Sequence, residues 1–249
     1  MIELFDAQAG FGGARRGQPW VPAAEELLGI MDRLSVARAL VRTEFEEMDS
    51  NPMSSNQVLY EACARDESLV PCPAVLPVGH GDVPPEQEQI EEMLAYGSAA
   101  AVLRPELDGW STAEWCAGTL LRLLEERRIP VLCRQSAVGF DTVANIAGRH
   151  PRLPIVVFQI SYRFQRTLVP LMAAFPNVYV AVGSPYSVHM GLESMAARVG
   201  AERLLFGSGF PFSEPMASVT MLTYSELGDA DKKLVGSGNL DRLIGGIRR

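Results

Sequence analysis

The stretches Ile155-Val156-Val157-Phe158 and Val178-Tyr179-Val180-Ala181-Val182 are short apolar runs without polar alternation. A strand buried on both faces has this composition, and such strands occur mainly in parallel sheets covered by helices. Runs of similar length recur along the chain. The expected strands are Ile2–Asp6, Ala37–Arg42, Val70–Leu76, Ala99–Arg104, Pro130–Arg134, Pro154–Gln159, Val178–Val182 and Arg203–Gly207.

Amphipathic helical patterns lie between these strands. Residues 23–34 place Leu27, Leu28, Met31 and Leu34 on one face. In residues 112–128 we expect Thr112 to cap a helix that turns Trp115, Leu120, Leu121 and Leu124 inward. Further helices are expected at Glu86–Tyr96, Thr142–His150, Arg163–Phe175 and Val188–Val199, loops at Asp49–Ser55 and Gly79–Pro85, and two short closing helices within Tyr224–Gly245.

Eight alternations of strand and helix in 249 residues predict one (β/α)8 TIM barrel spanning residues 1–249. A doubly wound open sheet is the alternative, because periodicity does not separate these two architectures.

Composition excludes several classes of partner. The chain has 22 basic and 30 acidic residues and a net charge of −8, which argues against nucleic acid, since phosphate backbones require a basic face. No apolar run reaches the length of a membrane span or a signal peptide.

The four cysteines, Cys63, Cys72, Cys116 and Cys133, lack metal-ligand spacing. We therefore expect reduced thiols in a cytoplasmic protein.

Two segments resemble landmarks of the amidohydrolase-related barrel family. Phe5–Gly12 contains Asp6-Ala7-Gln8-Ala9-Gly10 where that family has Asp-x-His-x-His, and Arg203–Phe212 contains Phe206-Gly207-Ser208-Gly209-Phe210-Pro211 where it has Phe-Gly-Ser-Asp-x-Pro. Weaker similarities, in the same order as in the family, are Glu25–Val36, Asn56–Ala62, Asn177–Val180 and Gly238–Gly245. The resemblance implies a TIM barrel whose site lies at the carboxyl ends of the strands.

The resemblance also implies that the metal-binding and acid/base residues have been replaced. The first-strand histidines correspond to Gln8 and Gly10, the fifth- and sixth-strand histidines to Arg134 and Gln159, and the eighth-strand aspartate to Gly209. Amides are poor zinc ligands, glycine offers no side chain, and arginine repels a divalent ion. A metal-independent lactonase variant of the family still uses the aspartate that Gly209 replaces. We therefore expect no metal and no cofactor, as in a pseudoenzyme.

The remaining polar residues near the predicted strand ends are candidates for ligand binding: Gln8, Arg104, Arg134, Gln135, Gln159 and Ser184. Paired arginines suit a small anionic ligand, because a guanidinium grips a carboxylate or phosphate through two hydrogen bonds. Glu44 and Arg134 are the catalytic candidates, as base and electrostatic clamp.

Structural alternatives to these site roles exist. The arginines could instead form ion pairs with Glu44 or Glu106, and Gln8 and Gln159 could form a mutual hydrogen-bond network. His150 is expected at the surface or facing the dipole of a helix end. His80 and His189 could reach the barrel mouth, and residues 207–209 could form a backbone nest for an anion.

Three functions remain open from the residues. The first is a catalytically degenerate barrel that binds a small anion or a protein partner. The second is a metal-independent hydrolase or lyase with a rewired site at Glu44 and Arg134. The third is an ordinary metal-dependent hydrolase with misassigned ligands. A homo-oligomer is also possible, because Trp20, Trp110, Trp115 and Met216–Met221 could form an interface or belong to the core.

Overall fold

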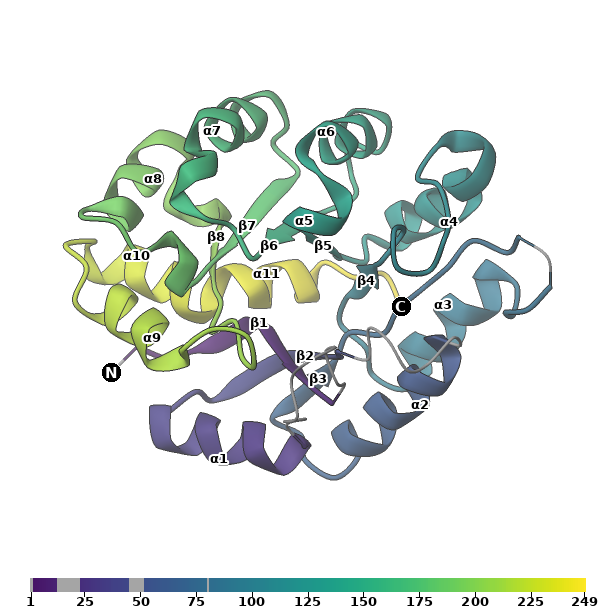
Figure 1. Cartoon of the computed structure of the whole chain (residues 1–249), viewed down its shortest axis with the longest axis horizontal. Helices are drawn as coiled ribbons and strands as arrows, with labels where there is room; N and C mark the ends of the chain where they lie inside the picture. Colours follow the sequence, from purple (N-terminus) through teal and green to yellow (C-terminus); the bar gives the residue numbers. More distant parts are fainter. Residues whose placement is uncertain (1, 13–22, 45–51, 80) are drawn as a thin grey trace.

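The computed structural model describes residues 2–12, 23–44, 52–79 and 81–249. Within these residues the strands all pair in parallel and in chain order, in one sheet of β1-β2-β3 and another of β4-β5-β6-β7-β8 (Figure 1). The strands are β1 (Phe5–Phe11), β2 (Arg38–Thr43), β3 (Leu69–Pro71), β4 (Ala101–Leu103), β5 (Val131–Arg134), β6 (Ile155–Phe158), β7 (Val178–Val182) and β8 (Leu204–Phe206).

The two sheets close into a barrel at two seams. Between β3 and β4, Ala74 forms a parallel bridge with Val102, and the Val102 N–H donates to the Pro73 carbonyl at 2.8 Å. Between β1 and β8, the Gly10 N–H donates to the Phe210 carbonyl at 3.0 Å. The predicted TIM barrel is therefore confirmed over the open sheet.

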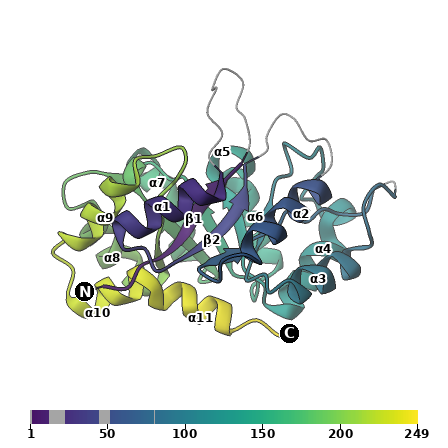
Figure 2. The same ribbon diagram turned by 90° about the horizontal axis from the view of Figure 1, so that it is seen from below.

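Helices surround the barrel (Figure 1). They are α1 (Ala24–Leu34), α2 (Pro52–Cys63), α3 (Glu86–Ala95), α4 (Glu114–Arg127), α5 (Gln135–Val138), α6 (Phe140–Arg149), α7 (Gln165–Ala174), α8 (Gly191–Val199), α9 (Pro215–Thr223), α10 (Asp229–Lys233) and α11 (Asn239–Gly245). A π-helical segment, Leu234–Gly238, joins the last two. Figure 2 shows α10 and α11 at the end of the barrel where both termini lie, opposite α5. No helix in the described ranges is long and apolar enough to cross a membrane.

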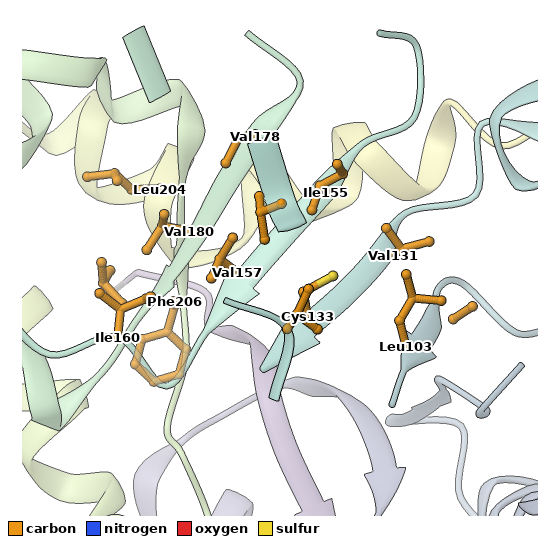
Figure 3. Packing of buried hydrophobic residues seen from close by; sticks show 14 of the residues in the cluster. Leu103, Val131, Cys133, Ile155, Val157, Ile160, Val178, Val180, Leu204 and Phe206 are labelled. Atoms are coloured by element: carbon orange, nitrogen blue, oxygen red, sulfur yellow. The ribbon is translucent and has the colours of Figure 1, made fainter. Parts of the chain in front are cut away.

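Successive strand residues pack into two different cores. Val131, Cys133, Ile155 and Val157 belong to the cluster between strands and helices (Figure 3). The intervening residues, including Leu132 and Val156, belong to a second cluster that also contains Leu240 and Leu243 of α11. Because neighbouring strand residues point to opposite faces, both faces of these strands are buried, as their composition predicts.

Three local predictions are wrong. The expected loop at Asp49–Ser55 is partly helical, because α2 begins at Pro52, a residue suited to the first helical turn. Thr112 does not cap α4, which begins after Ala113 without a side-chain cap. Trp115 is 82% exposed, whereas Leu124 is buried. Trp115 precedes Leu124 by about two and a half helical turns, so the two residues face opposite ways.

Candidate functional site

A cavity of about 530 Å³ opens at the carboxyl ends of β2, β4, β5 and β6. Its charged lining residues come from several strand ends and are Arg42, Glu44, Arg104, Glu106 and Arg134. Its apolar walls include Val102, Leu103, Leu107 and Phe158. The cavity thus lies where TIM barrels place their sites, and it combines guanidinium groups with an apolar wall.

Glu44 joins two arginines at this cavity. Its Oε2 accepts from Nη2 of Arg134 at 2.5 Å, and its Oε1 contacts Nη2 of Arg42. Arg42 also donates from Nη1 to the Ala9 carbonyl at 3.0 Å, and the Glu44 N–H donates to the Phe11 carbonyl at 3.0 Å. These contacts fasten the ends of β1, β2 and β5 to one another.

Arg42 is almost completely buried, with 2% of its surface exposed. Burial lowers the pKa of its guanidinium, and the Glu44 carboxylate opposes that shift. The guanidinium carbon lies 4.4 Å from the centre of the Phe158 ring, within cation–π distance. The Nε atom of Arg42 has no hydrogen-bond partner among the described residues. A buried donor of this kind favours a ligand or a water at the cavity wall.

Arg104 pairs with Asp108 rather than with Glu44 or Glu106, so its expected ion pairing is corrected. Its Nε and Nη2 atoms donate to the two Asp108 carboxylate oxygens at 3.1 and 3.0 Å. Burial raises the pKa of Asp108, and the Arg104 charge opposes that shift. The turn after β4 brings Asp108 back over Arg104, which sequence spacing alone did not indicate. The expected pairing of Arg134 with Glu44 is confirmed.

The predicted hydrogen-bond network between Gln8 and Gln159 is absent from the described residues. Gln8 is fully buried, and its amide oxygen and nitrogen both lack partners there. Its side chain packs against Gly207 and Gly209. Gln159 follows β6 with a φ of 57°, a left-handed conformation. Neither amide lines the cavity. Gln8 instead fills space that the two glycines leave inside the barrel.

Two other candidates also lie off the cavity lining. Gln135 begins α5, and its neighbours Ser136 and Ala137 line the cavity instead. Ser184 begins a short 3-10 helix, where its N–H donates to Ser218 Oγ at 2.9 Å. Among the candidates of the sequence analysis, the structure therefore brings together Glu44, Arg104 and Arg134.

Sequence reasoning missed Arg42 and Phe158. Arg42 ends the second expected strand, and Glu44 stands two positions later. Side chains two residues apart in a strand share a face, so this spacing could have identified the pair. Phe158 ends an apolar run, so nothing in the sequence distinguishes it from an ordinary core residue.

The histidines form no part of the cavity wall that the structure describes. His189 is exposed, and His80 lies outside the described residues. His150 is buried rather than at the surface, and its Nδ1 lies 3.2 Å from Oε2 of Glu125. The expected surface position is wrong because Glu125 of α4 contacts the ring, but His150 does lie at a helix end, as the residue that follows α6.

The expected anion nest at residues 207–209 holds an internal carboxylate. Asp6 Oδ1 accepts from the Ser208 N–H at 2.9 Å and from the Gln8 N–H at 2.8 Å. Burial raises the pKa of Asp6, and these hydrogen bonds oppose the shift. An external anion would have to displace this carboxylate, so the nest belongs to the seam between β1 and β8.

The residues that the resemblance places at the family's metal positions lack the side chains that hold a divalent metal. Among the described residues, no three His, Cys, Asp or Glu side chains gather as a metal site. A β-carbon on Gly10 would lie 2.7 Å from Oε1 of Glu44, so the ion-paired carboxylate fills that position. A β-carbon on Gly209 would lie 2.8 Å from the β-carbon of Ser213. The guanidinium groups of Arg42 and Arg134 both contact the Glu44 carboxylate beside Gly10, and their positive charges would repel a cation there.

Comparison with solved structures supports the barrel architecture. 5-Carboxyvanillate decarboxylase from Sphingomonas paucimobilis is 11% identical, with 100% of both chains covered and a TM-score of 0.76. A dihydroxybenzoic acid decarboxylase from a Polaromonas species, with bound manganese and 2-nitroresorcinol, is 13% identical, with 98% of this chain and 97% of that one covered and a TM-score of 0.74. 2,6-Dihydroxybenzoate decarboxylase from Rhizobium is 15% identical, with 98% and 99% covered and a TM-score of 0.71.

Sequence comparison gives the family. No curated protein matches the chain significantly. A family model described as amidohydrolase matches residues 25–245, which is most of the chain. The protein therefore belongs to the amidohydrolase family.

Proposed function

We propose that this barrel binds a small organic carboxylate without a metal ion and does not carry out the family's metal-dependent chemistry. The observation that carries the proposal is the convergence of Arg42, Arg104 and Arg134 on one cavity of about 530 Å³. Charge-assisted hydrogen bonds from guanidinium groups are the usual means of holding a carboxylate. The cavity volume suits a ligand of ordinary metabolite size.

The walls of the cavity support an organic ligand over a bare inorganic ion. Val102, Leu103, Leu107 and Phe158 offer apolar surface beside the arginines. Burying the body of a ligand against such a wall contributes about 25 cal/mol per Å². The similar decarboxylases have benzoate-type acids in their names, which makes an aromatic carboxylate the first compound to test.

The catalytic alternative would require Glu44 to accept a proton from a substrate. Both oxygens of its carboxylate contact guanidinium groups, one of Arg42 and one of Arg134. Proton transfer to Glu44 would therefore break an ion pair at a buried position, which is costly. For this reason we favour binding over a rewired lyase or hydrolase at this cavity.

Calorimetric titration tests the proposal. The protein, dialysed against a chelator, is titrated with 2,6-dihydroxybenzoate, benzoate and inorganic phosphate. We expect the aromatic carboxylates to bind, and Arg104→Gln to weaken them by at least about tenfold, the size of one lost charged hydrogen bond. Arg122→Gln is the matched control, because Arg122 forms an exposed ion pair with Glu126 away from the cavity. Failure of both aromatic acids to bind would overturn the proposal.

A further inference from the structure

Phe212 contacts an arginine of the cavity and lines a second hollow of the molecule. Its ring centre is 5.5 Å from the guanidinium carbon of Arg134, which lines the cavity. Phe212 also lines a groove of about 770 Å³ formed with Ile30 and Leu34 of α1 and Met216 of α9. The ring therefore lines the groove and stands within cation–π distance of Arg134, which lines the cavity.

Arg134 has further contacts that restrict its side chain. Phe158 places a second ring centre 5.8 Å from the same guanidinium carbon, and Glu44 accepts its hydrogen bond at 2.5 Å. A free arginine side chain has large rotamer entropy, and ordering it on binding costs affinity. Contacts that hold Arg134 in place before the ligand arrives therefore favour binding.

The position of Phe212 depends on the turn that starts at Gly209. The Gly209 carbonyl accepts from the N–H groups of Phe212 and Ser213, both at 2.9 Å. Gly209 has a φ of 75°, and a β-carbon there would lie 2.8 Å from the β-carbon of Ser213. The turn thus requires glycine where the family has its aspartate, and the same turn brings a phenyl ring to Arg134.

We infer that Phe212 is a positioning residue that orients Arg134 for carboxylate binding. The loop after β8 thus provides the Phe212 ring, which contacts the anion-binding Arg134. It does not provide an acid/base side chain at Gly209. This inference rests on the proposed function, because it assigns Phe212 a part in the same site.

Two measurements on the full chain test the inference. In the first, benzoate, or 2,6-dihydroxybenzoate where wild type binds only that acid, is titrated into wild type, Phe212→Leu, Phe212→Met and Phe212→Tyr. The leucine and methionine variants are expected to bind about two- to fivefold more weakly, the effect of losing one cation–π contact. The tyrosine variant keeps an aromatic ring and is expected to bind within about twofold of wild type. Phe164→Leu is the control, because Phe164 packs on Phe140 outside the cavity.

The second measurement needs no ligand. In the NMR spectrum of the free protein, Phe212→Leu is expected to shift the Nε–H signal of Arg134, because the ring current is lost. The Arg38 signal is the internal reference, since its guanidinium carbon lies 4.3 Å from the Phe5 ring centre and is untouched by the variant. Thermal melts show whether each variant is folded, and Phe212→Met replaces Phe212→Leu if the latter unfolds.

The outcomes separate the two proposals. If wild type binds benzoate but Phe212→Leu and Phe212→Met bind equally well, the role of Phe212 is wrong and the proposed function stands. The same conclusion follows if Phe212→Tyr weakens binding as much as the aliphatic variants do, or if the Arg134 signal does not move. If wild type binds neither benzoate nor 2,6-dihydroxybenzoate, the proposed function fails and the inference fails with it.

Discussion

A β-carbon on Gly10 would lie 2.7 Å from Oε1 and 2.8 Å from Cγ of Glu44. The space of a side chain at position 10 is therefore taken by a carboxylate that two arginines hold in place. The backbone carbonyl of Arg42, 3.2 Å from the same point, blocks a small shift. The glycine at position 10 and the ion-paired position of Glu44 therefore depend on each other.

Gly10→Ala is expected to destabilise the protein by about 1–3 kcal/mol, because the added methyl group overpacks a rigid site. Denaturant unfolding measures the change. Gly29→Ala is the control, since a β-carbon at this helical position meets no atom within 4 Å. The control should stabilise the protein by about 0.5–1 kcal/mol through its effect on the unfolded chain. Equal stability of Gly10→Ala and wild type would show that Glu44 moves freely.

Glu44→Gln is expected to cost about 3–5 kcal/mol, because it leaves the buried Arg42 and its neighbour Arg134 without their shared carboxylate. Glu126→Gln, which breaks an exposed pair with Arg122, should cost less than about 1 kcal/mol. A loss below 1 kcal/mol for Glu44→Gln would contradict the central place of this carboxylate.

The buried carboxyl group of Asp6 makes the stability of the protein depend on pH, and the direction of its pKa shift gives the sign. Burial raises its native pKa above the ordinary value of 3.8, so the unfolded chain releases this proton at lower pH than the folded protein does. The stability of wild type relative to Asp6→Asn should therefore fall as pH rises from about 4 through the native pKa.

Asp66→Asn is the control of opposite sign. Hydrogen bonds from Ser68 lower the pKa of Asp66, so the stability that this carboxylate adds is present above pH 3.8 and is lost as pH falls through its native pKa. Unfolding measured from pH 3 to pH 8 compares the two variants. Parallel curves for Asp6→Asn and wild type would mean that Asp6 titrates as in the unfolded chain.

Gln8→Met is expected to stabilise the protein by about 1–2 kcal/mol. The Gln8 amide is fully buried, and neither of its polar atoms has a partner among the described residues, so an apolar side chain of similar length removes an unpaired polar group. The melting temperature measures the gain. A clear loss of stability would indicate that a bound water or ligand satisfies the amide.

The barrel could be predicted from the sequence because the alternation of apolar strands and amphipathic helices recurs along the whole chain. β7, Val178–Val182, coincides with its predicted range. β1 does not: it runs from Phe5 to Phe11, beyond the expected end at Asp6. Its second half, Gln8-Ala9-Gly10-Phe11, has no continuous apolar run, and pairing with β2 makes it a strand. β3 is shorter than expected because Pro71 and Pro73 cannot donate to a ladder.

The site could be predicted only in part. Position along the barrel strands identified Glu44 and Arg134 as neighbours, because strand ends meet at one mouth. The pairing of Arg104 with Asp108 depends on the path of the turn after β4, and the isolation of Gln8 depends on the absence of side chains at Gly207 and Gly209. Both are three-dimensional packing effects that the residue types at single positions do not encode.

The central claim is that the cavity binds a carboxylate through arginines and not through a metal ion. Its most direct test is the affinity for 2,6-dihydroxybenzoate measured by calorimetry in chelator and again with added Mn²⁺. We predict the same affinity in both conditions for wild type, and weaker binding in both for Arg104→Gln. Binding that appears only with Mn²⁺, or release of CO₂ from the ligand when Mn²⁺ is present, would contradict the account.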